Sequence, residues 1–336
     1  MQRLERGLNG LLDRADGLVD SQMGPFLTET NCCLTPHFHS RKLLQKLLPW
    51  AFPYQFIDVE GRNTFARMEE NWRKGRATIV CVTHFDKGEV PAAIGMIVDH
   101  LSDEYLASGV KIVIPASYHQ KTMVGPLGWF GNIDMCFVVN QDTIDLKKSR
   151  KGKRKTIFSR LLQKEEEELK LGDGVEEYLE ELADAVRKGG TGYIAIQGGR
   201  RDHLGEPGIV LSLLLNHLER NGLTNYDILF IGSGLKDPVW QVGDWKIGES
   251  IPQTKSWIPV ESYVGRNGFN RRCLHVFRAG PLVSREELME ILDRYHAAFG
   301  EGKKSKYARL RQADRWAFDM IREHGLVDAA YLQDHV

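Results

Sequence analysis

The feature that most restricts the fold is an alternation, from residue 76 onward, of short apolar runs with longer segments of helical periodicity. The short runs are rich in β-branched residues and are typical of buried strands; they occupy residues 78–83, 110–116, 135–140, 192–197 and 226–234. Helical spacing of apolar residues covers 90–101, 175–188 and 207–221. Strands that alternate with helices predict an α/β fold, with a central sheet flanked by helices.

Helical segments are expected on both sides of this α/β region. After a last strand-like run at 273–283, Ser284 and Glu287 form a capping box that predicts a helix over 284–300, and a final helix is expected from about 303 to 324. We therefore expect an N-terminal helical region at 1–55, an α/β domain at 56–285 and C-terminal helices at 286–336 that pack on the core.

The N-terminal region carries two apolar patterns. Residues 1–20 have leucines at helical spacing, and the basic segment 41–56 has apolar bulk, so both predict helices that pack on the rest of the chain. The alternative for the second segment is contact with a membrane surface. That contact would use Leu43, Leu44, Leu47, Leu48, Trp50 and Phe52.

Charge and cysteine content exclude several classes of protein. Lysine plus arginine and aspartate plus glutamate each total 45, and this balance does not favour nucleic acid. The five cysteines are odd in number and lack C-x-x-C spacing, which favours a reducing, cytoplasmic setting. The N-terminus is too charged for a signal peptide, and no apolar run approaches the roughly 18 to 20 residues of a membrane span. Any membrane contact is expected to be peripheral.

A first cluster of chemistry-bearing residues follows the strand at 78–83. His84 is placed where α/β folds hold reacting groups, beyond the carboxyl end of a strand, and its neutral imidazole can take a proton from a hydroxyl. Glu89, near the start of the next helix, is the expected orienting acid. Asp86 is the rival orienter or a helix cap, and Lys87 and Gly88 are candidate backbone donors to an oxyanion.

A second cluster lies in the turn after the strand at 192–197. Gly198 and Gly199 allow close approach of the backbone to a ligand, and Arg200 and Arg201 suit paired hydrogen bonds to a phosphate or carboxylate. The alternative is a tight turn whose arginines pair with nearby acids. Both interpretations stay open on the residues alone.

A basic segment stands between the third and fourth strand-like runs. Seven of the nine residues from 147 to 155 are basic: Lys147, Lys148, Arg150, Lys151, Lys153, Arg154 and Lys155. Such a segment is either a solvated loop or a docking surface for an acidic partner.

The order of these pieces resembles the glycerolipid acyltransferase superfamily, which includes the glycerol-3-phosphate and lysophosphatidate acyltransferases. The resemblance covers roughly residues 55–285: a Val-Glu-Gly element at 59–61, a strand followed by the His-x4-acid motif of His84 and Glu89, an apolar second block at 125–140, and a glycine-arginine turn at 197–202. The family acid is usually aspartate, and Glu89 is the form found in the related acyltransferases of lipid A synthesis.

The resemblance implies an acyltransferase-like mixed sheet and direct acyl transfer. His84, oriented by Glu89, would take the proton of a hydroxyl that attacks an acyl thioester, without an acyl-enzyme and without a metal or cofactor. The implied donor is acyl carrier protein or coenzyme A, with the basic segment as a dock for the acidic carrier protein. The implied acceptor is glycerol phosphate or a lysophospholipid, in lipid biosynthesis and phospholipid metabolism.

Two other classes remain as alternatives. One is a metal-dependent hydrolase with His84, Asp86 and either Asp202 or His203 as ligands, which inhibition by chelators would favour. The other is a noncatalytic acyl or lipid binding protein of the same fold, which thioester turnover would exclude.

Overall fold

The computed structural model describes most of the residues beyond position 51. The chain divides into two units, Met1–Thr35 and Pro36–Val336, and every described residue belongs to the second. The described residues are 42–43, 45–46, 48–49, 52–85, 89–118, 133–139, 170, 172–198, 203–236, 241–242, 245–246, 275–300 and 308–332.

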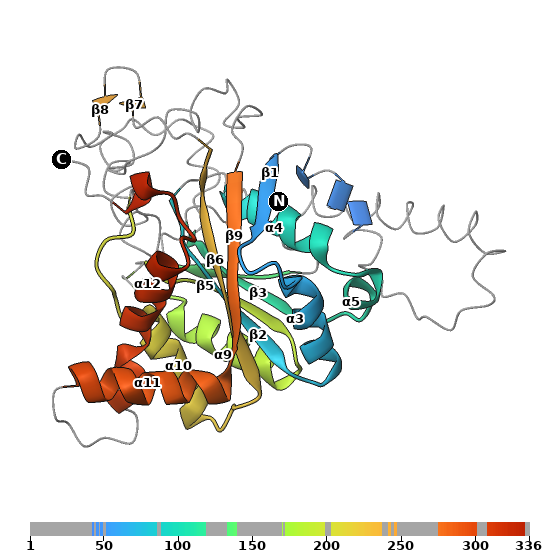
Figure 1. Ribbon diagram of the computed structural model, residues 1–336. Coiled ribbons are helices and arrows are strands. Elements are labelled where there is room, and N and C mark those ends of the chain that lie inside the picture. The colour runs from blue at the N-terminus through green and yellow to red at the C-terminus, as the bar shows by residue number, and fades with distance from the viewer. Residues whose placement is uncertain are drawn as a thin grey trace, which may run out of the picture. The chain divides into compact units, whose positions relative to one another are not determined.

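The second unit is built on a seven-stranded sheet (Figure 1). In spatial order its strands are β1 (Tyr54–Asp58), β9 (His275–Ser284), β6 (Tyr226–Leu235), β2 (Ala77–Val82), β5 (Thr191–Ala195), β3 (Ile112–Ser117) and β4 (Asp134–Val138). The last five of these are parallel, whereas β9 pairs antiparallel with β6 and carries β1 parallel to itself at the edge. The predicted α/β class and the mixed sheet are therefore confirmed. A separate pair joins β7 (Gln241–Val242) to β8 (Trp245–Lys246).

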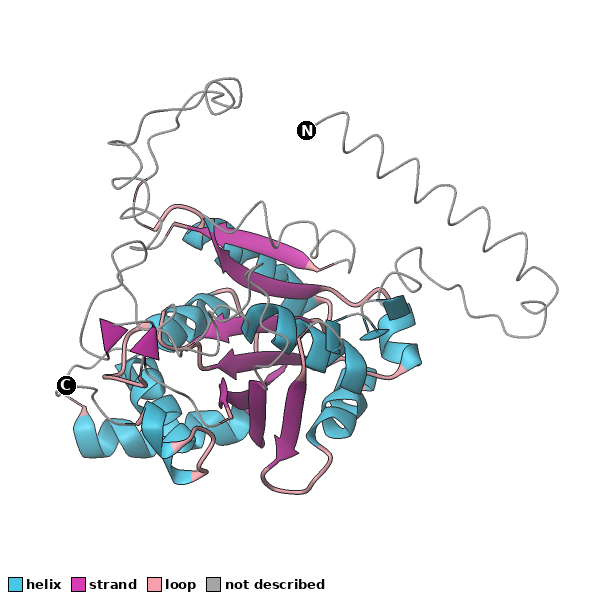
Figure 2. Ribbon diagram, turned by 90° about the horizontal axis from the view of Figure 1, so that it is seen from above, coloured by secondary structure: helices cyan, strands magenta, loops and turns pink. Residues whose placement is uncertain are grey.

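Helices cover both faces of this sheet (Figure 2). One face is covered by α3 (Thr64–Arg73), α4 (Glu89–His100) and α5 (Asp103–Ala107). The other is covered by α9 (Val175–Arg187), α10 (Val210–Arg220), α11 (Arg285–Phe299) and α12 (Ala313–Glu323), with the 3-10 turns η3 (Ala308–Gln312) and η4 (Ala329–Tyr331). Alternate side chains of each strand serve the two faces: Ile79 and Cys81 of β2 enter one apolar core, and Val80 enters the other.

The strands and helices expected beyond residue 76 are present with shifted ends, the helix expected within 1–20 lies outside the described residues, and one expectation is wrong. The Ser284 hydroxyl accepts from the Glu287 amide at 3.2 Å, as a capping box requires, and the last expected helix appears as η3 followed by α12. The helical pattern over 41–56 does not continue to its end, because Tyr54 begins β1. Pro53 explains the break, since proline lacks an amide hydrogen and favours an extended residue before it. Leu48 of this segment is buried and Leu43 is exposed.

Strands β3 and β5 separate after two paired positions, and a proline is the cause. They pair only at Ile112 with Thr191 and at Val113 with Gly192, although both strands continue. The backbone of every second residue of β5 faces β3, so the Tyr193 carbonyl would next accept from the amide of residue 115. Residue 115 is proline and has no amide hydrogen. The two strands therefore diverge toward their carboxyl ends and leave a wedge in the sheet.

A tyrosine from α9 satisfies the carbonyl that this divergence leaves behind. The buried Tyr178 hydroxyl donates a hydrogen bond to the Tyr193 carbonyl. Burial of Tyr178 raises the pKa of its hydroxyl, which therefore stays protonated and remains a donor. The wedge is thus a stable feature of the sheet, because the Tyr193 carbonyl that lacks a strand partner is paired with the Tyr178 hydroxyl.

Candidate active site

The candidate site lies at the carboxyl edge of the sheet, where two neighbouring strands send their chains in opposite directions. The chain leaves β2 for α4 on one face, and it leaves the adjacent β5 for α10 on the other. Such a switch point opens a crevice between the two connections, where α/β proteins bind ligands. His84 follows β2 and Gly198 follows β5, so both predicted turns border this crevice.

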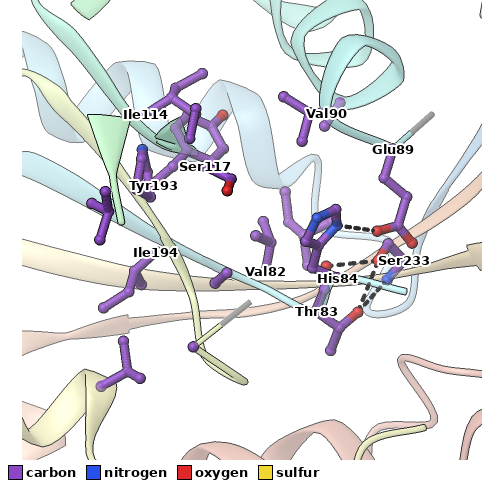
Figure 3. A pocket seen from close by; sticks show the side chains of 18 of the residues that line it. Val82, Thr83, His84, Glu89, Val90, Ile114, Ser117, Tyr193, Ile194 and Ser233 are labelled. Carbon is purple, nitrogen blue, oxygen red and sulfur yellow. Dashed lines mark hydrogen bonds and ion pairs between the residues drawn. The ribbon is translucent and has the colours of Figure 1, made fainter. Parts of the chain in front are cut away.

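A buried carboxylate holds the His84 ring. The Nδ1 atom of His84 lies 2.8 Å from Oε2 of Glu89, the first residue of α4 (Figure 3). The same Oε2 accepts the backbone amide of Phe85 at 2.8 Å. The Glu89 side chain is 4% exposed and that of His84 is 18% exposed. The predicted pairing of His84 with Glu89 is therefore present in the structure.

This geometry fixes which ring nitrogen of His84 could act as a base. A carboxylate only accepts hydrogen bonds, so the neutral imidazole carries its proton on Nδ1 and presents the lone pair of Nε2. Oε1 of Glu89 is buried and makes no hydrogen bond with the described residues. The pair therefore has the arrangement of a general base with its orienting acid.

The side chain of Gln197 joins the two turns that border the crevice. Its Oε1 accepts the backbone amide of His84 at 2.6 Å, and its Nε2 donates to the His203 carbonyl at 3.0 Å. The next residue, Gly198, has a φ of +70°, and a Cβ there would lie 3.2 Å from a Val210 methyl group. Glycine therefore suits the conformation and the close approach of α10 to this turn.

Two hydroxyl groups fix the strand end immediately before His84. The Ser233 amide of β6 donates to Thr83 Oγ1 at 2.8 Å, and the Ser233 hydroxyl donates to the Thr83 carbonyl at 2.7 Å. Both side chains are buried. These two hydrogen bonds hold the residue after the end of β2 against β6, and they limit the backbone positions that His84 can adopt.

An apolar cavity of about 300 Å³ adjoins the histidine and enters the wedge between β3 and β5. Residues from both faces of the sheet line it, among them Ile94 and Ile97 of α4 and Leu179 of α9. Of the polar side chains in the lining, Thr83, Glu89 and Ser233 lie near His84. Figure 3 shows Val82 beside this group and Ile114, Ser117 and Tyr193 on the opposite side of the cavity. A cavity of this size and character is typical of sites for apolar ligands.

The described cysteines do not supply a nucleophile to this cavity. Cys81 and Cys136 are both buried, and neither belongs to the cavity lining. Burial raises the pKa of the Cys81 thiol well above its usual range, and the nearby Asp314 carboxylate adds to this effect. Burial also raises the pKa of Cys136, to about 12. Both thiols therefore stay protonated at neutral pH, and a thiol is a poor nucleophile.

Several predicted site residues lie outside the described residues. The structure brings together His84, Glu89 and Gly198 around the crevice. The predicted residues that the structure does not describe are Asp86, Lys87, Gly88, Gly199, Arg200, Arg201, Asp202 and the basic segment 147–155. Among the residues that are described, no three of histidine, cysteine, aspartate and glutamate come together as metal ligands. The metal alternative, with His84, Asp86 and either Asp202 or His203 as ligands, depends on Asp86, which is not among the described residues, and it stays a prediction.

Four residues that shape the site were not predicted from the sequence. Gln197 stands at the start of the glycine-rich turn, and Thr83 and Ser233 stand in strand-like runs. Their roles depend on contacts 113 and 150 residues apart, for which spacing gives no signal. Pro115 did carry a signal, because a proline inside an apolar run predicts an interrupted strand pair.

Comparison of the chain with protein-family models and with curated proteins gives no match. Within the part of the chain that the structure describes, every helix is too short or too polar to cross a membrane. The function is therefore inferred from the geometry of the crevice and from the resemblance of its motifs.

Proposed function

We propose that this protein transfers a fatty acyl group from a thioester to a hydroxyl group. The observation that carries the proposal is the hydrogen bond between His84 and the buried Glu89 at the polar end of an apolar cavity. A base beside an apolar chain site suits a reaction that joins a hydroxyl to an acyl chain. The resemblance of the His84 and Glu89 motif to glycerolipid acyltransferases supports the same reaction.

In this proposal the acyl chain occupies the cavity and its thioester carbonyl lies beside His84. Nε2 of His84 takes the proton of the acceptor hydroxyl, whose oxygen forms a bond to the carbonyl carbon. The tetrahedral intermediate then expels the thiolate, which takes the proton from the imidazolium. Glu89 stabilises the positive ring between these two steps. No enzyme nucleophile is needed, in agreement with the protonated state of Cys81.

The substrates are proposed from chemistry and from the resemblance. The donor is acyl carrier protein or acyl coenzyme A, and the acceptor is a glycerol phosphate or a lysophospholipid in phospholipid synthesis. The basic segment 147–155 supplies the charge that an acidic carrier protein would recognise. Peripheral contact with a membrane surface fits an acceptor that resides in lipid.

The test is transfer from acyl thioesters of several chain lengths to a panel of hydroxyl acceptors, with ester products identified by mass spectrometry. We expect His84→Ala to lower the rate by about two to four orders of magnitude, because it removes the general base. The matched control is His100→Ala on the same helix α4, since the His100 ring bonds the Met96 carbonyl, packs on Phe56 and Phe65 and lies outside the cavity lining. That control should keep the parent rate.

Three outcomes would contradict the proposal. If a folded His84→Ala variant turns over at the parent rate, His84 is not the general base. Binding of acyl thioesters without any turnover identifies a noncatalytic binding protein. Loss of activity with a chelator, restored by a divalent metal, identifies a metal-dependent enzyme.

A further inference from the structure

The C-terminal segment packs directly behind the candidate site. Its approach depends on two glycines of β6 that flank Ser233. A Cβ on Gly232 would lie 2.0 Å from the Leu326 carbonyl oxygen, and a Cβ on Gly234 would lie 2.8 Å from the Tyr331 ring. Such distances exclude any side chain at either position unless the segment moves. The two glycines therefore allow the C-terminal segment to pack against β6, the strand whose Ser233 is hydrogen-bonded to Thr83.

Tyr331 contacts three separate parts of the site from a fully buried position. Its hydroxyl oxygen accepts the Leu235 amide at the end of β6, at 2.9 Å. Its backbone carbonyl accepts the Leu204 amide at 2.7 Å, just beyond the turn that Gln197 holds. Its ring packs on the Phe85 ring, with 4.2 Å between the ring centroids. The side chain of Tyr331 thus connects the ends of β2 and β6, and its backbone carbonyl adds the segment that follows β5.

The contact with Phe85 reaches the catalytic pair. Phe85 is fully buried, and its amide donates to the same Glu89 oxygen that holds Nδ1 of His84. A change in the position of Phe85 therefore changes the position of the amide that orients the Glu89 carboxylate. It also moves His84, which precedes Phe85 in the chain.

We propose that Tyr331 is a positioning residue of this site, which holds Phe85 so that Glu89 and His84 keep their hydrogen bond. This inference rests on the proposed function for its kinetic consequences but not for its structural ones. A salt bridge of 2.7 Å between Arg278 and Asp328 fixes the segment that carries the tyrosine. The C-terminal region thus contributes to the site, although the resemblance to the acyltransferase family ends near residue 285, before this region begins.

The first experiment compares substitutions of two buried tyrosines. Tyr331→Leu should lower kcat about tenfold with little change in KM, because it disturbs the base and not the binding of substrate. Tyr331→Phe keeps the ring against Phe85 and should recover most of kcat. The control is Tyr226→Leu, which removes a fully buried tyrosine at the opposite end of β6. It should destabilise the fold and leave kcat unchanged below the unfolding temperature.

A double-mutant cycle separates positioning from general loss of structure. If Tyr331 acts through the pair, Tyr331→Leu should cause no further loss of rate in a Glu89→Gln background. An equal loss in both backgrounds would show that its effect does not pass through Glu89 and would overturn the proposal.

A spectroscopic test is independent of turnover. In protein with 15N-labelled histidine, the His84 resonances, assigned by their absence in His84→Ala, should report a ring protonated at Nδ1. Tyr331→Leu should shift these resonances toward a mixture of tautomers, and Tyr226→Leu should not. Unchanged His84 resonances in Tyr331→Leu would refute the positioning role. Failure of the proposed function alone would instead leave this shift intact and abolish only the kinetic effects.

Discussion

A buried carboxylate lies at each end of the neighbouring strands β2 and β6, and the two carboxylates differ in their hydrogen-bond partners. At the amino end, Asp227 is 1% exposed; its two oxygens accept from Arg76 at 2.7 and 3.0 Å and from Asn71 at 2.6 Å. At the carboxyl end, only Oε2 of Glu89 accepts hydrogen bonds from the described residues. A carboxylate with both oxygens bonded to fixed partners supports the fold, whereas one directed at a histidine beside a cavity has the arrangement of a catalytic acid.

The largest effect that distinguishes the two carboxylates is on turnover. Glu89→Gln should lower kcat by about one to three orders of magnitude, because an amide cannot stabilise the imidazolium that forms during proton transfer. The loss should be smaller than that of His84→Ala and larger than that of Asp86→Asn. Rates measured under saturating donor and acceptor give this order. A larger loss in Asp86→Asn would make Asp86 the orienting acid.

The next effect is on stability and belongs to the other end of the strands. Asp227→Asn should lower the free energy of unfolding by about 3 kcal/mol, because it leaves the Arg76 guanidinium without its buried partner. Urea denaturation measures this change. The kcat of the folded variant should match the parent. A loss of kcat comparable with that of Glu89→Gln would end the distinction between a structural and a catalytic end.

The smallest effect is expected between the two ends, at the buried Cys81 of β2. Cys81→Ala should change kcat by less than about twofold, because the raised pKa of this thiol keeps it protonated and it does not line the cavity. Steady-state kinetics from pH 6 to 9 provide the measurement. A large loss of activity, or capture of an acyl group on Cys81, would replace direct transfer with an acyl-enzyme route.

Much of the fold was predictable because its signals are local. The strand runs, the helix periods and the Ser284 cap each lie within a few residues, and the structure reproduces them with small shifts at their ends. The edge strand β1 was missed because its pairing partner, β9, lies more than 200 residues away. Short helices α3 and α5 lack a long apolar period and were not predicted.

The same division applies to the site. His84 and Glu89 are five residues apart, so a strand end and a helix start were enough to predict their pairing. Gln197 and Tyr331 act across 113 and 246 positions of the chain, respectively, on His84 and Phe85. Neither has a residue type that marks it as part of a site. Their roles follow only from the packing of the folded chain.

Pro115 divides the strand pairing of the sheet into two blocks. Strands β3 and β4 share five paired positions with each other but join the remaining strands through only two pairs between β3 and β5. Those two pairs lie at the amino end, and the cavity occupies the opening on the other side. Both blocks contribute to both apolar cores, because Val113 and Cys136 pack in one core and Ile112 and Ile114 pack in the other. Close packing therefore fixes the angle between the blocks, and the opening has one set width for a ligand.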